Sequence, residues 1–408
     1  MAIVQAQYGI DSLSVDLNFY SRNFYDDEFN NNINYEYGGR TYEDAYFING
    51  YDGSSDMVLA LLGHDFGFNS FGQANRGTVT ALGEGTYNGQ EIWSIQGISV
   101  SASRLNSVAL TASNADDRAL ISSVMSGNDI IQLSAFDDRF EGWDGNDRMI
   151  GAGGNDTLLG GGGNDTLRGE TGNDILNGGI GRDHLAGGQG DDIFVVTAGD
   201  VTIEQANGGT DRVDSAISWN LAAHVENLTL TGSVSATGKG NDLANRINGN
   251  AGSNVLNGGT GNDTISGNAG NDRIVGGAGN DILKGGVGAD TLVGGLGQDM
   301  MYGGFGLTRD VFIFNSALDS RVGGQRDQLF DFQLGRDDIN LLGVDANSRL
   351  AGNQGFDFSG TQADEHSVWL VRQAGAVIVR GDINGDLNAD FEIWVNGVTS
   401  LNEDNFLL

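Results

Sequence analysis

The stretch GGNDTLLGGGGNDTLRGETGNDIL, residues 153–176, repeats one pattern every nine residues. Asp156, Asp165 and Asp174 mark the repeat, and a leucine follows two residues after each of them. Glycine, which loses more conformational freedom on folding than any other residue, fills most positions between them. Aspartates that such a repeat brings close together repel one another, so the pattern predicts a fold that something outside the chain must stabilise.

The nine-residue template G-G-x-G-x-D-x-U-x, in which U is apolar, describes two blocks of the chain. Six nonads in one register cover residues 142–195, and a second block covers residues 249–302, where Asn254 replaces the first aspartate. The aspartates of the full nonads are Asp147, Asp156, Asp165, Asp174, Asp183 and Asp192 in the first block, and Asp263, Asp272, Asp281, Asp290 and Asp299 in the second. A fixed period is typical of a stacked repeat fold. A flexible linker rich in glycine and aspartate would not keep the apolar residue in phase through both blocks.

Each block has irregular units at one end. Two weaker nonads precede the first block in the same register and carry Asp129 and Asp138. The unit GGFGLTRDVFIF, which follows the second block, has two extra residues before Asp310. This irregularity predicts that the array ends near residue 313.

The template also predicts the shape of one coil. We expect G-G-x-G-x-D to form a turn and x-U-x to form a short strand whose apolar residue points inward. Two nonads then make one coil, so each nonad stacks on the second nonad after it. Stacked carboxylates about 4.8 Å apart repel by about 3–4 kcal/mol at an effective dielectric constant near 20. A hard divalent cation between the turns would turn them into ligands, and an all-oxygen set of ligands favours Ca²⁺.

These repeats resemble the RTX family, the hemolysin-type calcium-binding proteins that bacteria secrete. The resemblance implies an all-β protein with a parallel β-roll in two RTX blocks and with several bound Ca²⁺ ions. We expect five parts: a β-rich N-terminal domain (1–123), the first roll (124–195), intervening strands (196–248), the second roll (249–313), and a β-rich C-terminal cap with a secretion signal (314–408). Residues 114–127 predict a short helix at the end of the N-terminal domain, with Asn114 as its cap.

Composition narrows the class of partner. The chain has 408 residues, 55 of them acidic and 21 basic, so its net charge is −34. This charge excludes nucleic acid as a partner and favours cations. No cysteine is present, so neither disulfides nor thiolate metal sites can form. No apolar run is long enough for a membrane span, and the first residues do not match a cleaved signal peptide.

The segments outside the repeats carry weaker signals. Residues 196–248 alternate apolar and polar positions, and we interpret them as an extension of the roll without metal; His184 and His224 are expected to be exposed. The regions 327–344 and 377–408 resemble those that follow the repeats in serralysin-type proteins. The tail NEDNFLL, residues 402–408, is similar to the signals that type I secretion machinery reads.

The C-terminal region also contains the sequence DINGDLNAD, residues 382–390, which partly matches a calcium-binding loop. Asp382, Asn384 and Asp386 occupy the first, third and fifth positions of that loop. Leu387 replaces the glycine that an EF-hand requires, and Ile393 stands at its last ligand position. These residues are metal-ligand candidates, and the alternative interpretation is a plain hairpin turn.

No catalytic motif is recognisable. The chain lacks the H-E-x-x-H of zinc proteases, the G-x-S-x-G of α/β-hydrolases and a phosphate-binding P-loop. The aromatic, Asn-rich and Asp-rich N-terminal region predicts a β-domain that either binds sugars or presents an ordinary surface.

The sequence therefore favours a non-enzymatic, secreted calcium-binding protein, located outside a bacterial cell. It would fold on Ca²⁺ and act as a structural, adhesive or surface-binding protein, with calcium, type I secretion machinery and a polysaccharide or cell surface as partners. Two alternatives stay open. One is an extracellular polysaccharide-acting enzyme whose site lies in residues 1–123, and the other is a protein that self-assembles in the presence of calcium.

Overall fold

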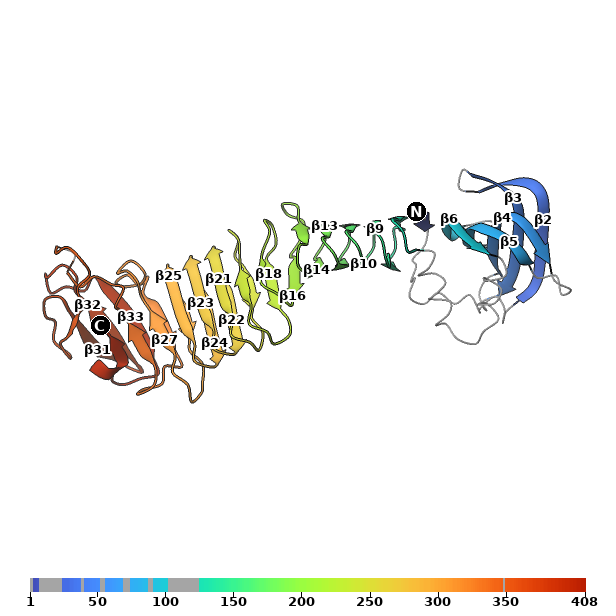
Figure 1. The fold of residues 1–408 in the computed structure, drawn as a ribbon. Helices are drawn as coiled ribbons and strands as arrows, with labels where there is room; N and C mark the ends of the chain where they lie inside the picture. The colour runs from blue at the N-terminus through green and yellow to red at the C-terminus, as the bar shows by residue number, and fades with distance from the viewer. Residues whose placement is uncertain are drawn as a thin grey trace. The chain divides into compact units, whose positions relative to one another are not determined.

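The computed structural model describes residues 3–6, 24–37, 40–51, 56–68, 74–86, 91–101, 125–347 and 349–408; up to residue 101 it describes strand backbones only. The chain divides into two compact units, Met1–Gly209 and Thr210–Leu408 (Figure 1). Within the described ranges the regular elements are β-strands and one short 3₁₀ helix, Glu403–Asn405. The prediction of an all-β fold is confirmed, whereas most of the predicted helix, residues 114–124, lies outside the described residues.

The first unit begins with an antiparallel sheet. Its strands are β1 (Ile3–Ala6), β2 (Phe24–Tyr37), β3 (Arg40–Tyr51), β4 (Asp56–Phe68), β5 (Ala74–Thr86) and β6 (Glu91–Ser101). Strands β2 to β6 pair antiparallel in sequence order. Strand β1 pairs antiparallel with β6 on one side and parallel with β7 on the other, so this sheet and one sheet of the first roll form a single eleven-stranded sheet.

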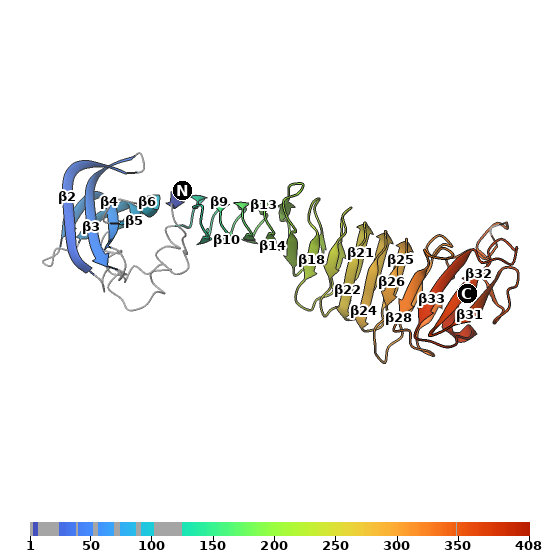
Figure 2. The same ribbon diagram turned by 180° about the vertical axis from the view of Figure 1, so that it is seen from behind.

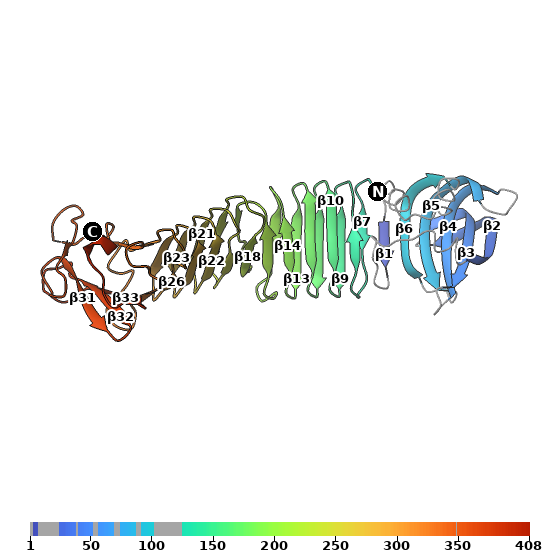
Figure 3. The same cartoon turned by 90° about the horizontal axis from the view of Figure 1, so that it is seen from below.

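The first roll consists of short parallel strands (Figure 3). They are β7 (Ile130–Gln132), β8 (Arg139–Glu141), β9 (Arg148–Gly153), β10 (Thr157–Gly162), β11 (Thr166–Thr171), β12 (Ile175–Ile180), β13 (His184–Gln189), β14 (Ile193–Val196) and β15 (Val201–Ile203). Strands β7 to β13 each pair with the second strand after them, as in Thr157↔Ile175 and Thr166↔His184. This offset of eighteen residues confirms that two nonads make one coil.

The division of the nonad into turn and strand differs from the prediction. The long strands cover six residues, x-U-x and the following G-G-x, so the turn shrinks to G-x-D. Gly163, in such a turn, has φ +133°, and a Cβ there would collide with the carbonyl oxygen of Gly145 in the preceding coil. Glycine is therefore needed both for the backbone angle and for the close stacking of turns. The apolar residue of each nonad points inward, and Leu158 and Leu167 are completely buried.

The second unit repeats this architecture (Figure 2). Its roll strands are β16 (Arg212–Ser215), β17 (Trp219–Asn220), β18 (Asn227–Leu230), β19 (Thr237–Lys239), β20 (Arg246–Asn248), β21 (Val255–Thr260), β22 (Thr264–Ala269), β23 (Arg273–Ala278), β24 (Ile282–Val287), β25 (Thr291–Leu296), β26 (Met300–Tyr302), β27 (Val311–Ile313), β28 (Asp327–Phe330) and β29 (Asp338–Asn340). The strands of the segment without repeats, β16 to β20, also pair in parallel with the second strand after them. His184 and His224 are exposed.

Parallel stacking continues beyond residue 313, where the sequence predicts the end of the array. Strand β28 pairs with β26, and β29 pairs with β27, in the same register as the preceding coils. The remaining strands are β30 (Asp357–Phe358), β31 (Ser367–Gln373), β32 (Ala376–Gly381), β33 (Phe391–Asn396) and β34 (Phe406–Leu407). Strands β31 to β33 pair antiparallel, β33 pairs with β28, and β34 pairs with β29. The end of the roll is thus covered, which removes the exposed strand edges of a stacked repeat.

Candidate metal centre

The predicted aspartates form two ladders in each roll, because alternate nonads stack on one another. In each case an Oδ1 atom accepts the backbone N–H of the residue eighteen positions earlier, as Asp165 does from Asp147 and Asp281 from Asp263, at 2.8 Å. The acceptors in the first roll are Asp147, Asp156, Asp165, Asp174 and Asp192, and those in the second are Asp263, Asp272, Asp281, Asp290 and Asp299. Asp183 accepts in the same way from Asp165 and passes the ladder on to Asp200. The structure therefore stacks the aspartates in the predicted n and n+2 pairs.

The second carboxylate oxygen, Oδ2, faces inward without a hydrogen-bond donor. This holds for Asp147, Asp156, Asp165, Asp174, Asp183, Asp263, Asp272, Asp281, Asp290 and Asp299, all of which are buried. A buried carboxylate oxygen without a donor is costly, because burial removes water and nothing replaces it. One such atom would be a local defect, but a row of them at a constant interval indicates that a ligand outside the chain belongs there.

Glycine shapes the space in front of these oxygens. A Cβ added to Gly160 would collide with Asp165 Oδ2 on one side and with the carbonyl oxygen of Gly178 on the other. The same arrangement recurs at Gly151 and Gly267. Each coil thus holds a small oxygen-lined space that only glycine leaves open. A hard cation that takes carboxylate and carbonyl oxygens at flexible geometry, above all Ca²⁺, fits this set of donors.

The electrostatics of the ladder are unfavourable without such a cation. Burial, together with the neighbouring carboxylates of Asp165 and Asp129, raises the pKa of Asp147 to about 7 against the opposing backbone hydrogen bond from Asp129. Burial raises the pKa of Asp165 to about 6 and that of Asp263 to about 7, in each case with a stacked aspartate as a further cause. The folded rolls therefore favour neutral aspartates, or a positive charge that compensates ionised ones.

Asparagine replaces aspartate where the second block begins. The Oδ1 atom of Asn254 accepts the N–H of Asn250, and its Nδ2 donates to Asn250 Oδ1 at 3.0 Å. One coil position earlier, Asn245 Nδ2 donates to the carbonyl oxygens of Val225 and Glu226 at 3.2 and 3.1 Å. An amide carries its own N–H donors. In these two coils the amide N–H groups donate to buried oxygens that would otherwise need a cation.

The aspartates of the two weak nonads also belong to the ladders. The N–H of Asp129 donates to Asp147, so this residue starts the ladder. Asp138 is buried, but its Oδ2 accepts both the N–H and the hydroxyl of Ser134 at 2.9 and 2.8 Å. Asp138 therefore closes the first turn with hydrogen bonds from the chain itself.

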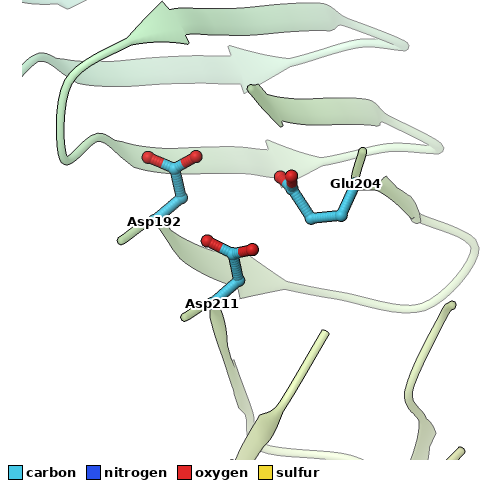
Figure 4. A group of neighbouring side chains, drawn as sticks. All are labelled: Asp192, Glu204 and Asp211. Atoms are coloured by element: carbon cyan, nitrogen blue, oxygen red, sulfur yellow. The ribbon is translucent and has the colours of Figure 1, made fainter. Parts of the chain in front are cut away.

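The last coil of the first unit places a glutamate where earlier coils have a carbonyl group. A carboxylate oxygen of Glu204 lies within 4.8 Å of one of Asp192 (Figure 4). Glu204 Oε1 also accepts the N–H of Gly187 at 3.0 Å, and a Cβ at Gly187 would collide with both carboxylates. The third residue drawn, Asp211, belongs to the second unit. Glu204 lies outside the nonads, so the repeat pattern did not predict it.

Four ladder aspartates lie outside the full nonads and were not predicted as ligands. They are Asp200, Asp310, Asp327 and Asp337. Asp310 accepts from Asp290, twenty residues earlier, and Asp327 from Asp299, twenty-eight residues earlier. Insertions before Asp310 and Asp327 and a spacing one residue shorter before Asp200 change the register, so a search at a period of nine does not find these positions. The signal that remains is the triplet Asp-x-apolar, as in Asp310-Val311-Phe312 and Asp327-Gln328-Leu329.

The loop of residues 382–390 is a hairpin connection. It joins the antiparallel strands β32 and β33. The Asp382 carboxylate accepts backbone N–H groups from Asn384, Gly385 and Leu387 at 2.7–3.0 Å, and these bonds hold its pKa below the usual value against the effect of burial. Because the chain itself satisfies this carboxylate, we do not propose Asp382, Asn384 and Asp386 as a calcium site.

A model of the RTX calcium-binding nonapeptide repeat matches the chain in four copies, at residues 125–158, 159–194, 239–274 and 275–306. The geometry of the rolls agrees with this match, so both rolls consist of RTX-type repeats folded as parallel β-rolls. Repeats of this family are calcium-binding in general. A comparison with curated protein sequences finds no match.

Several solved structures are similar to parts of the chain. The AlgE6R3 subunit of the Azotobacter vinelandii mannuronan C5-epimerase is 24% identical, over 43% of this chain and 80% of that one, with a TM-score of 0.27. The AlgE6R2 subunit of the same enzyme is 21% identical, over 43% and 92%, with a TM-score of 0.27. The extracellular lipase LipA of Serratia marcescens is 19% identical, over 68% and 40%, with a TM-score of 0.17.

Replacing one ladder aspartate by asparagine should separate its role as a hydrogen-bond acceptor from its role as a calcium ligand. In Asp165→Asn the Oδ1 atom can still accept the N–H of Asp147, but the buried negative charge is lost. We expect the variant to bind at least one calcium ion fewer per chain, and to keep more β structure than the wild type in calcium-depleted buffer. Calorimetry and circular dichroism measure the two effects.

The matched control is Asp137→Asn. Asp137 is exposed, occupies the position where other nonads have asparagine, and accepts the N–H of Asn155 in the next coil. The control should bind calcium like the wild type. Equal stoichiometry for Asp165→Asn and the control would contradict the assignment of Asp165 as a ligand.

The raised pKa values predict opposite pH responses with and without calcium. Without calcium, a carboxyl whose pKa rises from 3.8 to about 7 on folding, as in Asp147, stabilises the fold below about pH 4 and loses this effect as the pH passes 7. Acidification from pH 7.5 to 5.5 should therefore increase β structure in calcium-depleted buffer. In saturating calcium the same step should weaken the fold, because protons compete with the ion. A loss of β structure on acidification without calcium would contradict the prediction.

Proposed function

We propose that this protein is a secreted calcium-binding β-roll protein that folds outside the cell when it binds Ca²⁺ and then serves as a structural, adhesive or surface-binding component. The observation that carries the proposal is the row of buried Oδ2 atoms without donors in both rolls. Cytosolic calcium is scarce, so these carboxylates would remain ionised and solvated in an unfolded chain. Outside the cell, calcium would neutralise them and make the glycine-rich coils stable.

The net charge of the chain bears on the kind of partner that it can bind. With a net charge of −34 the protein would repel acidic surfaces unless divalent cations lie between them. A calcium-loaded roll presents ions to acidic polysaccharide, which makes a polysaccharide or matrix a suitable partner. The proposed binding module is the antiparallel sheet of β2 to β6. The alternatives remain a polysaccharide-acting enzyme with its site in residues 1–123 and a self-assembling protein.

Binding and catalysis can be separated with the calcium-loaded full chain. Cosedimentation with an acidic polysaccharide, without release of reducing ends or a change in the sugar units, would support the binding role. Conversion of the polysaccharide would favour the enzyme alternative. Association of the protein alone, seen by light scattering on adding calcium, would favour self-assembly.

No helix in the described residues is long and apolar enough to cross a membrane. For export we propose a type I secretion system, which reads a C-terminal signal. The tail residues Glu403 and Asp404, followed by Phe406, resemble such a signal. In the folded unit Phe406 is buried and β34 pairs with β29, so the same residues that would guide export also complete the sheet afterwards.

Calcium should control folding of the whole repeat region. We expect the chain to be largely unfolded in chelator and to gain β structure cooperatively on adding calcium, with an affinity in the range of extracellular modules, roughly 10⁻⁴–10⁻³ M. Circular dichroism during a calcium titration measures this, with magnesium as the control ion. Full β signal in chelator would overturn the proposal.

Deletion of residues 349–408 should abolish secretion by a cell with an intact type I system, because the deletion removes the proposed signal. The variant Asp165→Asn keeps the tail and serves as the control for a general folding defect. Immunoblots of medium and cells measure the distribution. Normal secretion of the truncated chain would contradict type I export but would leave the calcium rolls unaffected.

A further inference from the structure

The first roll has a hollow on the outer face of one of its sheets, away from the aspartate ladders. Strands β11, β13 and β15 form it, and its volume is about 550 Å³. This volume lies in the range of pockets that hold small ligands. The residues that shape the hollow are Arg168, His184, Ala186, Gly188, Ile203 and Gln205. All of them belong to the first unit.

Small residues in the middle strand leave the hollow open. The pairing register places Ala186 of β13 directly between Arg168 of β11 and Ile203 of β15. Gly188, two residues further along β13, has no side chain. Neighbouring parallel strands lie about 4.8 Å apart, so the two walls of the hollow stand about 10 Å apart. The floor is therefore low and apolar, with room for the flat face of one sugar ring.

The charge of this surface is opposite to that of the chain as a whole. Arg168 and His184 line the hollow, and no acidic side chain does. On the same sheet, the residues on either side of each inward-facing residue of β7, β9, β11, β13 and β15 include Arg148 but no Asp or Glu. In a chain with a net charge of −34, such a surface is suited to an anion.

Arg168 is the side chain that can bind the charge of such a ligand. Its guanidinium pairs with Glu170, two residues further along the same strand, at 2.8 Å. A guanidinium carries further N–H donors in one plane, and their geometry matches the two oxygens of a carboxylate. Both side chains are partly exposed, so the pair contributes little to stability, and Arg168 can be replaced without loss of the fold.

We propose that this hollow binds one uronate unit of an acidic polysaccharide, a sugar ring that carries a carboxylate, without a bridging calcium ion. The carboxylate pairs with Arg168, the ring lies on Ala186 and Gly188, and the hydroxyl groups meet the polar side chains of His184 and Gln205. The inference rests on the proposed function, which names an acidic polysaccharide as partner, and it deepens that function by giving the contact a place on the first roll.

The test uses the full-length protein in saturating calcium, with a galacturonate trisaccharide as the probe. Calorimetry should show binding of the trisaccharide but not of its methyl ester, which keeps the rings and loses the charge. Arg168→Gln should weaken binding about tenfold or more, because it removes a charge-assisted pair. Ala186→Leu should abolish binding, because it fills the floor of the hollow and keeps every charge. Binding of both variants like the wild type would overturn the site.

The matched control is Arg148→Gln, which removes the same charge from the same face, opposite Thr166, but outside the lining of the hollow. It should bind like the wild type, and a loss equal to that of Arg168→Gln would overturn the hollow in favour of general attraction. Triglutamate, which has carboxylates without sugar rings, should bind far more weakly; equal binding would overturn the choice of a sugar. Circular dichroism of the same samples separates the two proposals. A wild type that folds on calcium but does not bind the trisaccharide overturns the hollow alone, and one that neither folds nor binds overturns the proposed function as well.

Discussion

Both rolls depend on the ionisation of carboxylates that the fold buries in stacks. A ladder aspartate of a full nonad, such as Asp165 or Asp281, accepts a backbone N–H of the preceding coil with one oxygen and buries the other without a donor. The hydrogen bond stabilises stacking, whereas the buried charge opposes it. A cation bound in front of the inward oxygens compensates the buried charge, so the carboxylates then stabilise the stacking instead of opposing it. The stability of the coil is thereby linked to an ion concentration.

The exceptions to this pattern show that the chain can also satisfy the ladder without metal. The backbone N–H groups of Asn245 and Asn254 still donate to the next ladder aspartates, and their side-chain Nδ2 groups donate to oxygens of the chain itself. At the start of the first roll, the hydroxyl of Ser134 donates to the Asp138 carboxylate in a similar way. A coil whose buried oxygens accept hydrogen bonds from the chain itself can form before calcium binds. Such coils lie at the start of each roll, before its full nonads.

The sequence predicted the all-β roll, the two nonads per coil and the stacked aspartate pairs, because the period of nine and the inward leucine leave few other folds. It placed too much of the nonad in the turn, since glycine signals a turn although here it also lies within strands such as β9. It missed Asp310 and Asp327 because insertions break the period while the three-dimensional register continues, and it missed Glu204 because that residue lies outside the nonads. Asp382 matched a calcium loop by residue type, but the positions of the neighbouring N–H groups, which no sequence pattern records, satisfy it internally.

A second ladder explains why insertions do not disrupt the stack. The residue before each ladder aspartate often accepts the N–H of the residue eighteen positions later, as Asn146 does from Asn164 and Asn262 from Asn280. These bonds point along the chain in the direction opposite to those of the aspartates, so each turn is fastened to the coil before it and to the coil after it. A coil with an insertion can lose the outer bond and keep the inner one, as Asp299 and Asp327 do. The inner hydrogen bond and the buried apolar residue thus continue across an insertion, so the length of the connection can change without ending the stack.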